Sequence, residues 1–466
     1  MNNRYFFFIT TITTLLLFSC SDDPSDPLDP DNEYAAVNQW IENTMRDNYL
    51  WYKEIPKKPN TKIEPQSFFL SLLSTKDGKQ KSMGRQYYSY MESSNSTLRA
   101  AGSDANLSLG FEYAYYYINI NKLDKYALKV LYMLPDSPAA KSELKRGEWI
   151  FTVNGEPISD DIVMNLNNGT TKTLGISSDP SSEVTKEVTL RPEIVEDNPV
   201  FFHKVYHRQG RRIAYLIYNH FTQGKNDRDE TYNNALRKVF SDFKKEMPTD
   251  FILDLRYNGG GVITSAQLLA TMLAPAEALE DVFCKTTYND KQSSRNYTYK
   301  FDTKYMQQGV NGANLDLKRL YVITSERTAS ASEAVINGLK PFLGDNLIII
   351  GEKTEGKNVG SISFEDKRFE WILHPIVCSI CNKNDESDYA NGFVPKNDKF
   401  IQTEPNYNLV ELGDENEYLL NFTLNQIAGI NAYNTEKRSV DVVNTHNLKY
   451  ISSSLDRKKT NGVLIK

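Results

Sequence analysis

The stretch from Leu320 to Gly360 reads LYVITSERTASASEAVINGLKPFLGDNLIIIGEKTEGKNVG and alternates apolar runs with polar, glycine-containing loops. The apolar runs Leu320–Ile323 and Leu347–Ile350 have the length and β-branched content of strands. Between them, residues 331–340 carry apolar side chains at helical spacing, and Pro341 predicts the end of that helix. Strand, helix and strand in this order favour a parallel pair with a crossover helix, which is typical of an α/β fold.

Two side chains of this stretch form a candidate catalytic pair. Ser330 stands where a loop enters the helix, so nearby backbone N–H groups lack helical partners and can stabilise an oxyanion. A serine hydroxyl needs a base, and Lys357, in the loop after the next strand, is the candidate. Both are expected at the carboxyl ends of neighbouring parallel strands, where ligand sites of such sheets form. A helix cap and a solvated loop lysine are the simpler alternatives.

A second segment of interest is DLRYNGGG, residues 254–261. It begins within the strand-like run Phe251–Leu255 and precedes a helical pattern that starts at Ile263. Glycines at a strand-to-helix turn allow backbone N–H groups to approach a ligand closely. An ordinary tight turn is the alternative, but three successive glycines favour a functional one.

Three motifs together carry a family resemblance. TASASE (Thr328–Glu333), GEKTEGK (Gly351–Lys357) and DLRYNGGG (Asp254–Gly261) resemble the signatures of the C-terminal-processing, or tail-specific, serine peptidases. The resemblance implies that Ser330 is the nucleophile and that Lys357 is the general base. The order and rough separation of the motifs also match the family.

The same resemblance implies an oxyanion hole. Its donors would be the amide of Gly260, with Gly259 as the neighbouring candidate, and the amide of Ala331. Many members of the family carry a glutamine four residues after the lysine, where this chain has the shorter Ser361. Glu333 is another candidate for a supporting role, so the residue that orients the base stays open. No metal or other cofactor is implied.

The N-terminal residues predict export. In residues 1–19, Arg4 precedes an apolar core that is shorter than the ~20 residues needed to cross a bilayer, which favours a signal peptide. The ending Leu-Phe-Ser-Cys resembles a bacterial lipoprotein signal with Cys20 as the lipidated residue; an ordinary signal with a chance cysteine is the alternative. Residues 20–33 are rich in Asp and Pro and predict an extended tether. We expect a protein anchored by lipid in the bacterial outer membrane, with surface exposure left open.

Composition excludes some functions. The net charge of −6 over 466 residues argues against a nucleic-acid surface, and the length predicts two to four domains. The pair Cys378 and Cys381 is compatible with a disulfide, and a metal site is disfavoured because no second ligand pair accompanies it. The histidines form no convincing ligand set, and we expect a structural role for His220.

Residues 34–101 have helical periodicity and predict a small helical domain. Residues 103–197 come next and have a different pattern. Their strand patterns, with the segments SPAAKSELKRGE and VNG, resemble a bacterial PDZ domain. A PDZ groove captures a peptide C-terminus as an added strand. The resemblance places the peptide-binding loop at Leu109, Gly110 and Phe111, although the tyrosine-rich insertion after it leaves the groove's details open.

Residues 198–430 alternate strands and helices and predict an α/β catalytic domain with a largely parallel sheet. The resemblance implies a crotonase-like spiral of ββα units. Residues 431–466 are polar and predict a loosely ordered C-terminal tail with weak strand pieces. The expected fold class is therefore multidomain α/β, with an N-terminal helical domain, a PDZ-like β domain and a crotonase-like catalytic domain.

The combined expectation is a serine endopeptidase of exported or cell-envelope proteins, with a Ser/Lys dyad and a PDZ domain that recognises substrate C-termini. One alternative is a catalytically silent, peptide-binding surface lipoprotein that keeps the fold. Another is a glycan-binding lipoprotein, suggested by the anchor and the tyrosines. The intact Ser330, Lys357 and glycine turn argue against a silent site, and neither alternative explains the three motifs. The substrate, the oligomeric state and whether the PDZ domain gates or recruits stay open.

Overall fold

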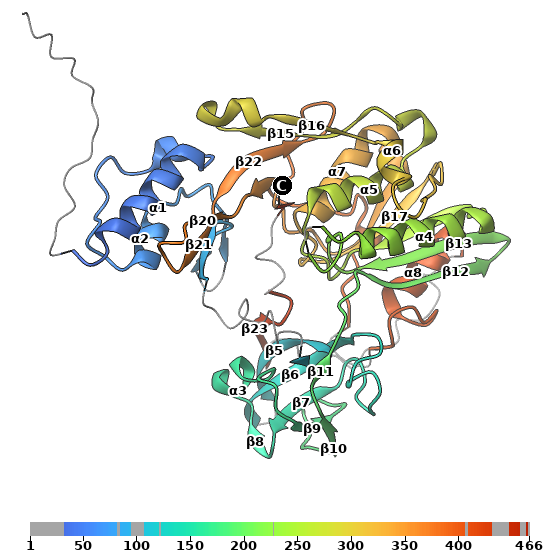
Figure 1. Ribbon diagram of the computed structural model, residues 1–466. Helices are drawn as coiled ribbons and strands as arrows, with labels where there is room; N and C mark the ends of the chain where they lie inside the picture. Colours follow the sequence, from blue (N-terminus) through green and yellow to red (C-terminus); the bar gives the residue numbers. More distant parts are fainter. Residues whose placement is uncertain are drawn as a thin grey trace, which may run out of the picture.

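The structure is a computed structural model that describes residues 32–81, 84–94, 107–120, 123–226, 228–405, 409–430, 447–456 and 463–464. Figure 1 shows N-terminal helices, a β-rich unit and a larger α/β unit. The predicted signal peptide, residues 1–19, and Cys20 lie outside the described residues. Within the described part, no helix has the length and apolar character needed to cross a membrane.

The α/β unit is built on a five-stranded sheet in the order β12-β13-β14-β17-β18. Its strands are β12 (Val200–Arg208), β13 (Arg211–Tyr218), β14 (Asp250–Asp254), β17 (Leu320–Thr324) and β18 (Leu347–Gly351). β12 and β13 are antiparallel, and the other neighbours are parallel. The predicted parallel pair is confirmed, because Ile323 of β17 lies opposite Ile350 of β18.

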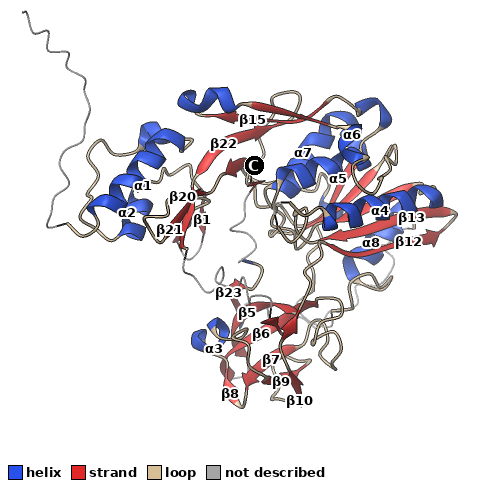
Figure 2. Cartoon of the chain, viewed as in Figure 1, coloured by secondary structure: helices blue, strands red, loops and turns tan. Residues whose placement is uncertain are grey.

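Helices cover both faces of this sheet (Figure 2). One face packs against α4 (Thr231–Glu246), α5 (Ile263–Leu273) and α7 (Ala331–Leu343), and the other against α8 (Tyr418–Ile427). The central strands are apolar on both faces because neither face meets water. β12, β13 and α4 form one ββα unit, and the crotonase-like classification stays a prediction.

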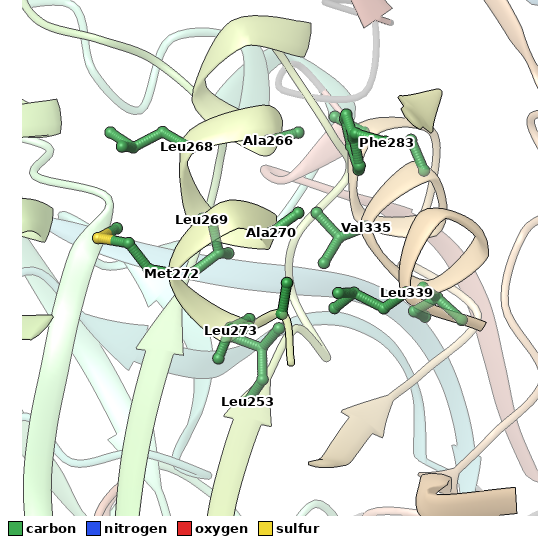
Figure 3. Close-up of a cluster of buried hydrophobic side chains, with 14 of the residues drawn as sticks. Leu253, Ala266, Leu268, Leu269, Ala270, Met272, Leu273, Phe283, Val335 and Leu339 are labelled. Atoms are coloured by element: carbon green, nitrogen blue, oxygen red, sulfur yellow. The ribbon is translucent and has the colours of Figure 1, made fainter. Parts of the chain in front are cut away.

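The contact between α5 and α7 shows how the core holds the helix that begins after Ser330. Leu269, Ala270 and Leu273 of α5 face Val335 and Leu339 of α7, and all five side chains are buried (Figure 3). Gly338 of α7 allows β15 (Val282–Tyr288) to approach, because a Cβ there would lie 2.6 Å from the ring of Phe283. α7 is thereby fixed against both its neighbouring helix and the next sheet.

Pro341 does not end α7, contrary to the prediction. The helix continues to Leu343, with Pro341 in its last turn. A proline inside a helix leaves the carbonyl four residues earlier without its N–H partner. Here that carbonyl belongs to Asn337, and it accepts a hydrogen bond from Asn382 Nδ2 at 3.3 Å. The side-chain donor replaces the missing backbone donor.

A second sheet lies beside α7 in the order β16-β15-β22-β19-β24. Its strands are β15 (Val282–Tyr288), β16 (Tyr297–Lys300), β19 (Val359–Ser361), β22 (Ile376–Cys381) and β24 (Val463–Leu464). The short helix α6 (Thr303–Met306) follows β16. β19 begins two residues after Lys357, so this sheet helps to hold the loop that carries the lysine.

The N-terminal region is only partly helical. α1 (Ala35–Asn48) and α2 (Pro65–Ser71) agree with the predicted periodicity. Beyond them the chain forms the hairpin β1 (Lys79–Lys81) and β2 (Gly84–Gln86), then β3 (Tyr90–Ser93). β3 pairs with β21 (Trp371–His374), which pairs with β20 (Phe364–Glu365). A shared three-stranded sheet therefore joins the N-terminal region to the α/β unit.

The β-rich unit coincides with the PDZ-like range. Its strands are β4 (Leu107–Ser108), β5 (Phe111–Ile120), β6 (Leu123–Met133), β7 (Trp149–Val153), β8 (Glu156–Pro157), β9 (Lys172–Ser177), β10 (Lys186–Leu190) and β11 (Glu193–Ile194), with one short helix, α3 (Asp160–Met164). The main sheet runs β10-β9-β7-β6-β5-β23. β23 (Leu448–Ser453) comes from the predicted tail, so part of that tail is an ordered strand of this sheet.

Candidate active site

Ser330 lies between the end of β17 and the start of α7, at the carboxyl edge of the parallel sheet. Its backbone has φ +61° and ψ −113°, and the residue is fully buried. A positive φ at a residue with a Cβ is costly and persists only where the surroundings enforce it. The packed α7 enforces it here, as does the hydrogen bond that the Ala329 N–H donates to the carbonyl of Asn258 at 3.2 Å.

The glycine turn packs directly against Ser330. A Cβ built on Gly260 would lie 2.8 Å from the Ser330 Cβ and 3.1 Å from the amide nitrogen of Ala331. Gly260 also has φ +112°, so both space and conformation require glycine. Gly259 is buried in the same turn. The structure therefore brings Gly260 and Ala331, two of the predicted oxyanion-hole residues, to the nucleophile.

The two predicted amide donors differ in their present partners. Ala331 is the first residue of α7, where helix geometry provides no acceptor for its N–H group. The Gly260 N–H donates to Asn258 Oδ1 at 2.9 Å. Asn258 is itself held by a hydrogen bond from its Nδ2 to the carbonyl of Tyr218 at 2.7 Å. The Ala331 amide is thus the donor that faces the site without rearrangement.

Glu333 connects the two halves of the site. Its Oε2 accepts hydrogen bonds from the backbone N–H of Ser330 at 2.9 Å and of Lys357 at 2.8 Å. Its Oε1 accepts from Thr354 Oγ1 and from the Gly356 N–H, both at 2.6 Å. Burial raises the pKa of this carboxyl to about 7, although these four donors oppose the rise. One carboxylate therefore fixes the serine loop against the lysine loop.

Lys357 is buried, with 5% of its surface exposed. Burial lowers the pKa of its amine from 10.5 to about 8, although the carboxylates of Asp77, Glu355 and Glu333 oppose the change. Its Nζ lies 5.2 Å from the centroid of the Tyr88 ring. A lysine that loses its proton near neutral pH has the property that a general base requires.

The N-terminal region supplies one wall of the lysine pocket. Tyr88 donates to Glu355 Oε1 at 3.5 Å, and Lys81 of the β1–β2 hairpin forms an ion pair with Glu355 Oε2 at 2.9 Å. Lys79 of the same hairpin donates to the Glu355 carbonyl. Asp77 is fully buried and accepts hydrogen bonds from Tyr49 Oη and from the N–H groups of Tyr88 and Ser89. The base is therefore enclosed by residues far from it in sequence.

Two sequence profiles match the chain. Residues 212–371 match peptidase family S41, and residues 36–90 match the peptidase S41 N-terminal domain. The Carboxy-terminal-processing protease of Bartonella bacilliformis is 28% identical over 239 residues, which are 49% of each protein. The chain thus spans about half the length of this curated relative.

A solved structure extends the likeness to most of the fold. A protein from Bacteroides fragilis NCTC 9343, whose crystal structure is described as that of an S41 protease, is 31% identical with a TM-score of 0.70. The alignment covers 84% of this chain and 97% of that one. The chain belongs to peptidase family S41. The resemblance to C-terminal-processing peptidases that the three motifs carried is confirmed at the level of the family.

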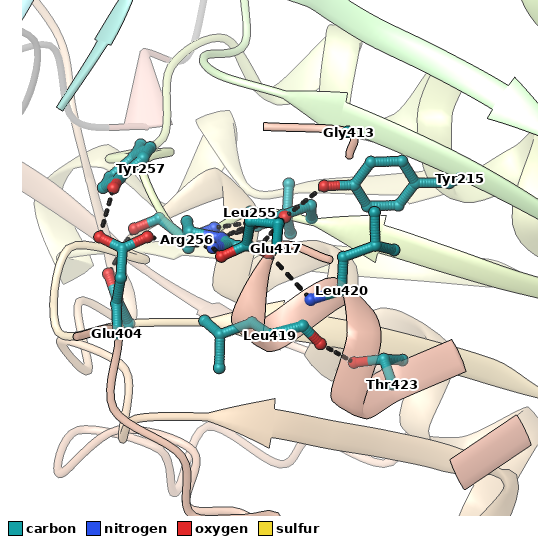
Figure 4. Close-up of polar contacts among 12 residues, drawn as sticks. Tyr215, Leu255, Arg256, Tyr257, Glu404, Gly413, Glu417, Leu419, Leu420 and Thr423 are labelled. Carbon is teal, nitrogen blue, oxygen red and sulfur yellow. Dashed lines mark hydrogen bonds and ion pairs between the residues drawn. The ribbon is translucent and has the colours of Figure 1, made fainter. Parts of the chain in front are cut away.

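In this S41 protein, the arginine of the DLRYNGGG motif has a structural role (Figure 4). Arg256 is buried and forms paired hydrogen bonds with Asp254 and with Glu417, the latter at 2.8 and 3.0 Å. Its Nη1 also donates to Glu404 at 3.0 Å. Tyr215 donates to Asp254 Oδ2 at 2.8 Å. The network ties the end of β14, and with it the glycine turn, to the start of α8.

Other side chains singled out in the sequence lie elsewhere. The Ser361 Oγ is buried and finds no hydrogen-bond partner among the described atoms, so nothing supports its replacing the family's glutamine. His374 contacts Ser363, Glu92 and Tyr90. His220 lies 3.9 Å from a carboxylate oxygen of Asp197.

The cysteines carry no disulfide within the described residues: Cys284, Cys378 and Cys381 are free thiols. The described His, Cys, Asp and Glu side chains form no cluster of three or more suited to a metal ion. Cys378 and Cys381 lie three residues apart on β22, where successive side chains alternate between the faces of the sheet. The two thiols therefore point to opposite faces.

The predicted peptide-binding loop lies at the start of β5. Leu109, Gly110 and Phe111 are all buried. The Gly110 N–H donates to Ser108 Oγ at 3.0 Å, and its carbonyl accepts from Ser137 Oγ at 3.0 Å. The backbone N–H and carbonyl groups of Gly110 are therefore already hydrogen-bonded to side chains of the same unit.

Sequence reasoning missed Asp77 and Tyr88 because they lie some 270 residues from the lysine and belong to no motif. It also left the role of Glu333 undecided. A carboxylate inside a serine motif was a visible signal, but three of its four partners come from residues 354–357, a loop that only the fold brings next to the motif.

Proposed function

We propose that this protein is a serine endopeptidase that uses a Ser330–Lys357 dyad. The observation that carries the proposal is a strained, buried serine at a helix start together with a buried lysine whose pKa is lowered to about 8. The backbone N–H groups of both residues donate hydrogen bonds to the Glu333 carboxylate. Such a lysine is neutral in a useful fraction of molecules near pH 8, so it can take the proton of the serine hydroxyl.

In the proposed reaction, Ser330 Oγ attacks the scissile carbonyl as Lys357 Nζ accepts its proton. The protonated lysine then gives that proton to the leaving amine, and water hydrolyses the acyl-enzyme. The Ala331 amide stabilises the oxyanion, joined by the Gly260 amide once that group exchanges Asn258 for the substrate oxygen. The buried site favours these bonds because it excludes water.

An active-site serine probe tests the nucleophile. A fluorophosphonate should label the wild-type protein and the Ser330→Ala variant should remain unlabelled and inactive on peptides. Ser332→Ala is the matched control, because Ser332 is two residues away, equally buried, and donates to the Asn258 carbonyl at 3.0 Å. Labelling that persists in Ser330→Ala and disappears in Ser332→Ala would move the nucleophile to Ser332.

The base is tested by charge and by pH. Lys357→Arg should be inactive because guanidinium stays protonated, whereas Lys357→His should keep a trace of activity. For the wild type, kcat/KM should rise with pH through an inflection near 8, as the lysine loses its proton. An active Lys357→Arg variant, or a pH dependence that disappears on replacing His220 or His374, would contradict the dyad.

We further propose that the substrates are exported or cell-envelope proteins recognised through their C-termini, and that lipid at Cys20 anchors the enzyme in the outer membrane. The signal-like sequence of residues 1–20 supports the anchor, and the name of the Bartonella relative supports C-terminal processing. Cys20→Ser should move the protein from the membrane to the soluble fraction. Tight membrane association of this variant would require a different anchor.

A further inference from the structure

The PDZ-like sheet carries a strand from the far end of the chain. β23 is the last strand of the order β10-β9-β7-β6-β5-β23, so it covers the edge of β5 that would otherwise be open. The pairing is antiparallel, with Leu448 opposite Ile118 and Ser453 opposite Ala114. An open sheet edge is the feature to which an extended peptide adds as a strand.

The orientation of β23 matches that of a peptide whose C-terminus points to the predicted binding loop. The last residues of β23 lie at the first residues of β5, next to Leu109–Phe111. There the Tyr113 N–H donates to Ser454 Oγ at 2.8 Å, and the Tyr113 carbonyl accepts from the Ser454 N–H at 3.0 Å. Ser453 Oγ donates to the same carbonyl at 2.7 Å. The backbone groups of Tyr113 that an incoming strand would use are already bonded.

β23 also contacts the loop that carries the nucleophile. The ring of Tyr450 packs edge-on against Tyr116 of β5, with centroids 5.7 Å apart. The guanidinium of Arg327 lies 5.4 Å from the centroid of the same Tyr450 ring. Arg327 precedes Ser330 by three residues, and it lines, with Tyr116 and Tyr450, a cavity of about 630 Å³ between the two units.

We propose that β23 occupies the PDZ-like edge as an intramolecular ligand and that an incoming peptide C-terminus displaces it. The displacement alters the conformation of the Ser330 loop through the contact between Tyr450 and Arg327. The identity of the competing ligand as a peptide rests on the proposed function. A tethered strand acts at a high effective concentration, so a free peptide binds weakly until β23 leaves. Binding of a substrate tail then changes the surroundings of the nucleophile.

A reversible lock tests the displacement. Lys449 and Tyr117 are paired residues of β23 and β5, so Tyr117→Cys with Lys449→Cys should form a disulfide between the strands. The probe is a fluorescein-labelled peptide with an apolar C-terminal residue and a free carboxylate, and its affinity is measured by anisotropy. Ser330→Ala is present in every chain to prevent cleavage. The oxidised lock should bind at least tenfold more weakly than the same protein after reduction.

The matched control is Lys449→Cys alone, whose affinity should not change with reductant. Ser454→Ala loosens β23 by removing the acceptor of the Tyr113 N–H, and it should bind the peptide more tightly than the parent. Equal affinities for the locked, parent and loosened chains, or no binding by any of them, would overturn the proposal. These arms need no catalysis, so they stand apart from any failure of the proposed peptidase activity.

The link to the active site has its own readout. With the intact Ser330, the unlabelled peptide added in trans should change kcat for a short chromogenic substrate at least twofold. Tyr450→Ala should remove this response, because it breaks the contact with Arg327. Tyr450→Phe keeps the ring and should keep the response. A response that is identical in Tyr450→Ala and wild type would refute the route through Tyr450.

Discussion

Lys357 illustrates at the scale of one residue how a catalytic property costs stability. The pKa of its amine is about 8 in the folded protein and about 10.5 in an exposed chain, because burial disfavours the charged form. The unfolded chain therefore binds more protons than the folded one between these two pH values, and stability rises with pH across that window. Below pH 8 the folded protein carries the full free-energy cost of burying the charged amine, which is about 3 kcal/mol for this pKa shift.

Replacing the lysine with an apolar side chain of similar length should remove this penalty. Lys357→Met should abolish activity and increase the free energy of unfolding at pH 7 by up to about 3 kcal/mol. The gain should shrink as the pH approaches 10. Urea unfolding at pH 7 and pH 9.5 measures both values. A loss of stability at pH 7 would mean that the charged amine is well compensated in the folded state.

At the scale of the element, α7 and the loop after β18 act as one unit because Glu333 bonds to both. Its carboxylate accepts four hydrogen bonds in a buried position. A glutamine of the same shape would turn an amide donor toward two N–H or O–H donors, which leaves buried groups unpaired.

Glu333→Gln should therefore lower kcat at least tenfold with a smaller change in KM, and it should destabilise the fold by about 2 kcal/mol or more. Steady-state kinetics with urea unfolding checks both effects. Glu246→Gln, at the exposed end of α4, is the matched control and should change neither. A Glu333→Gln variant with normal kcat would show that the carboxylate only supports folding.

Asp77 and Tyr88 act together at the scale of the element, since both lie near Lys357 and come from the N-terminal region. The Tyr88 ring shields the amine from water, whereas Asp77, Glu355 and Glu333 favour its charged form. Loss of the Tyr88 ring and loss of the Asp77 charge should therefore shift the pKa of Lys357 in opposite directions.

Tyr88→Ala should raise the inflection of the kcat/KM profile by about 1 pH unit or more, because water then reaches the amine. Asp77→Asn should lower it, because a negative charge near the amine is lost. Tyr88→Phe keeps the ring and should leave the inflection near 8. The pH profiles of the four proteins give the comparison. Identical inflections in wild type and Tyr88→Ala would place the source of the low pKa elsewhere.

At the scale of the whole molecule, buried ion pairs join the PDZ-like unit to the α/β unit. Arg146 of the PDZ-like unit donates to Glu404, to Tyr257 Oη at 3.1 Å and to the carbonyl of Leu131 at 2.8 Å. Burial alone would raise the pKa of Glu404, but Arg146, Arg256 and Lys129 lower it from 4.5 to about 2. The stability from this carboxylate is complete above about pH 4.5 and is lost as the pH falls toward 2.

Acid should therefore weaken the molecule through this junction. The free energy of unfolding of the wild type should fall by about 3 kcal/mol more than that of Glu404→Gln between pH 6 and pH 2. At pH 6 the variant itself should be destabilised, because it leaves buried guanidinium groups without a charge partner. Urea unfolding of both proteins at a series of pH values provides the test. Parallel pH dependences would exclude Glu404 as the acid-sensitive group.

The local sequence determined much of the fold and the centre of the candidate site. Apolar runs of strand length predicted β14, β17 and β18, since strands covered on both faces carry apolar side chains toward both. The motifs singled out Ser330, Lys357 and Gly260, and each lies in a loop that follows a strand of the parallel sheet, as the alternation of strands, loops and helices predicted.

Tertiary structure decided what depends on contacts between distant segments. Pro341 stays inside α7 only because Asn382 supplies a donor, and no local pattern contains that contact. The low pKa of Lys357 results from burial behind Tyr88, which a loop sequence does not reveal. The strand at Leu448–Ser453 has a weak pattern and becomes ordered because β5 offers it an edge. A sequence records which groups are present, whereas desolvation and long-range pairing exist only once the chain has folded.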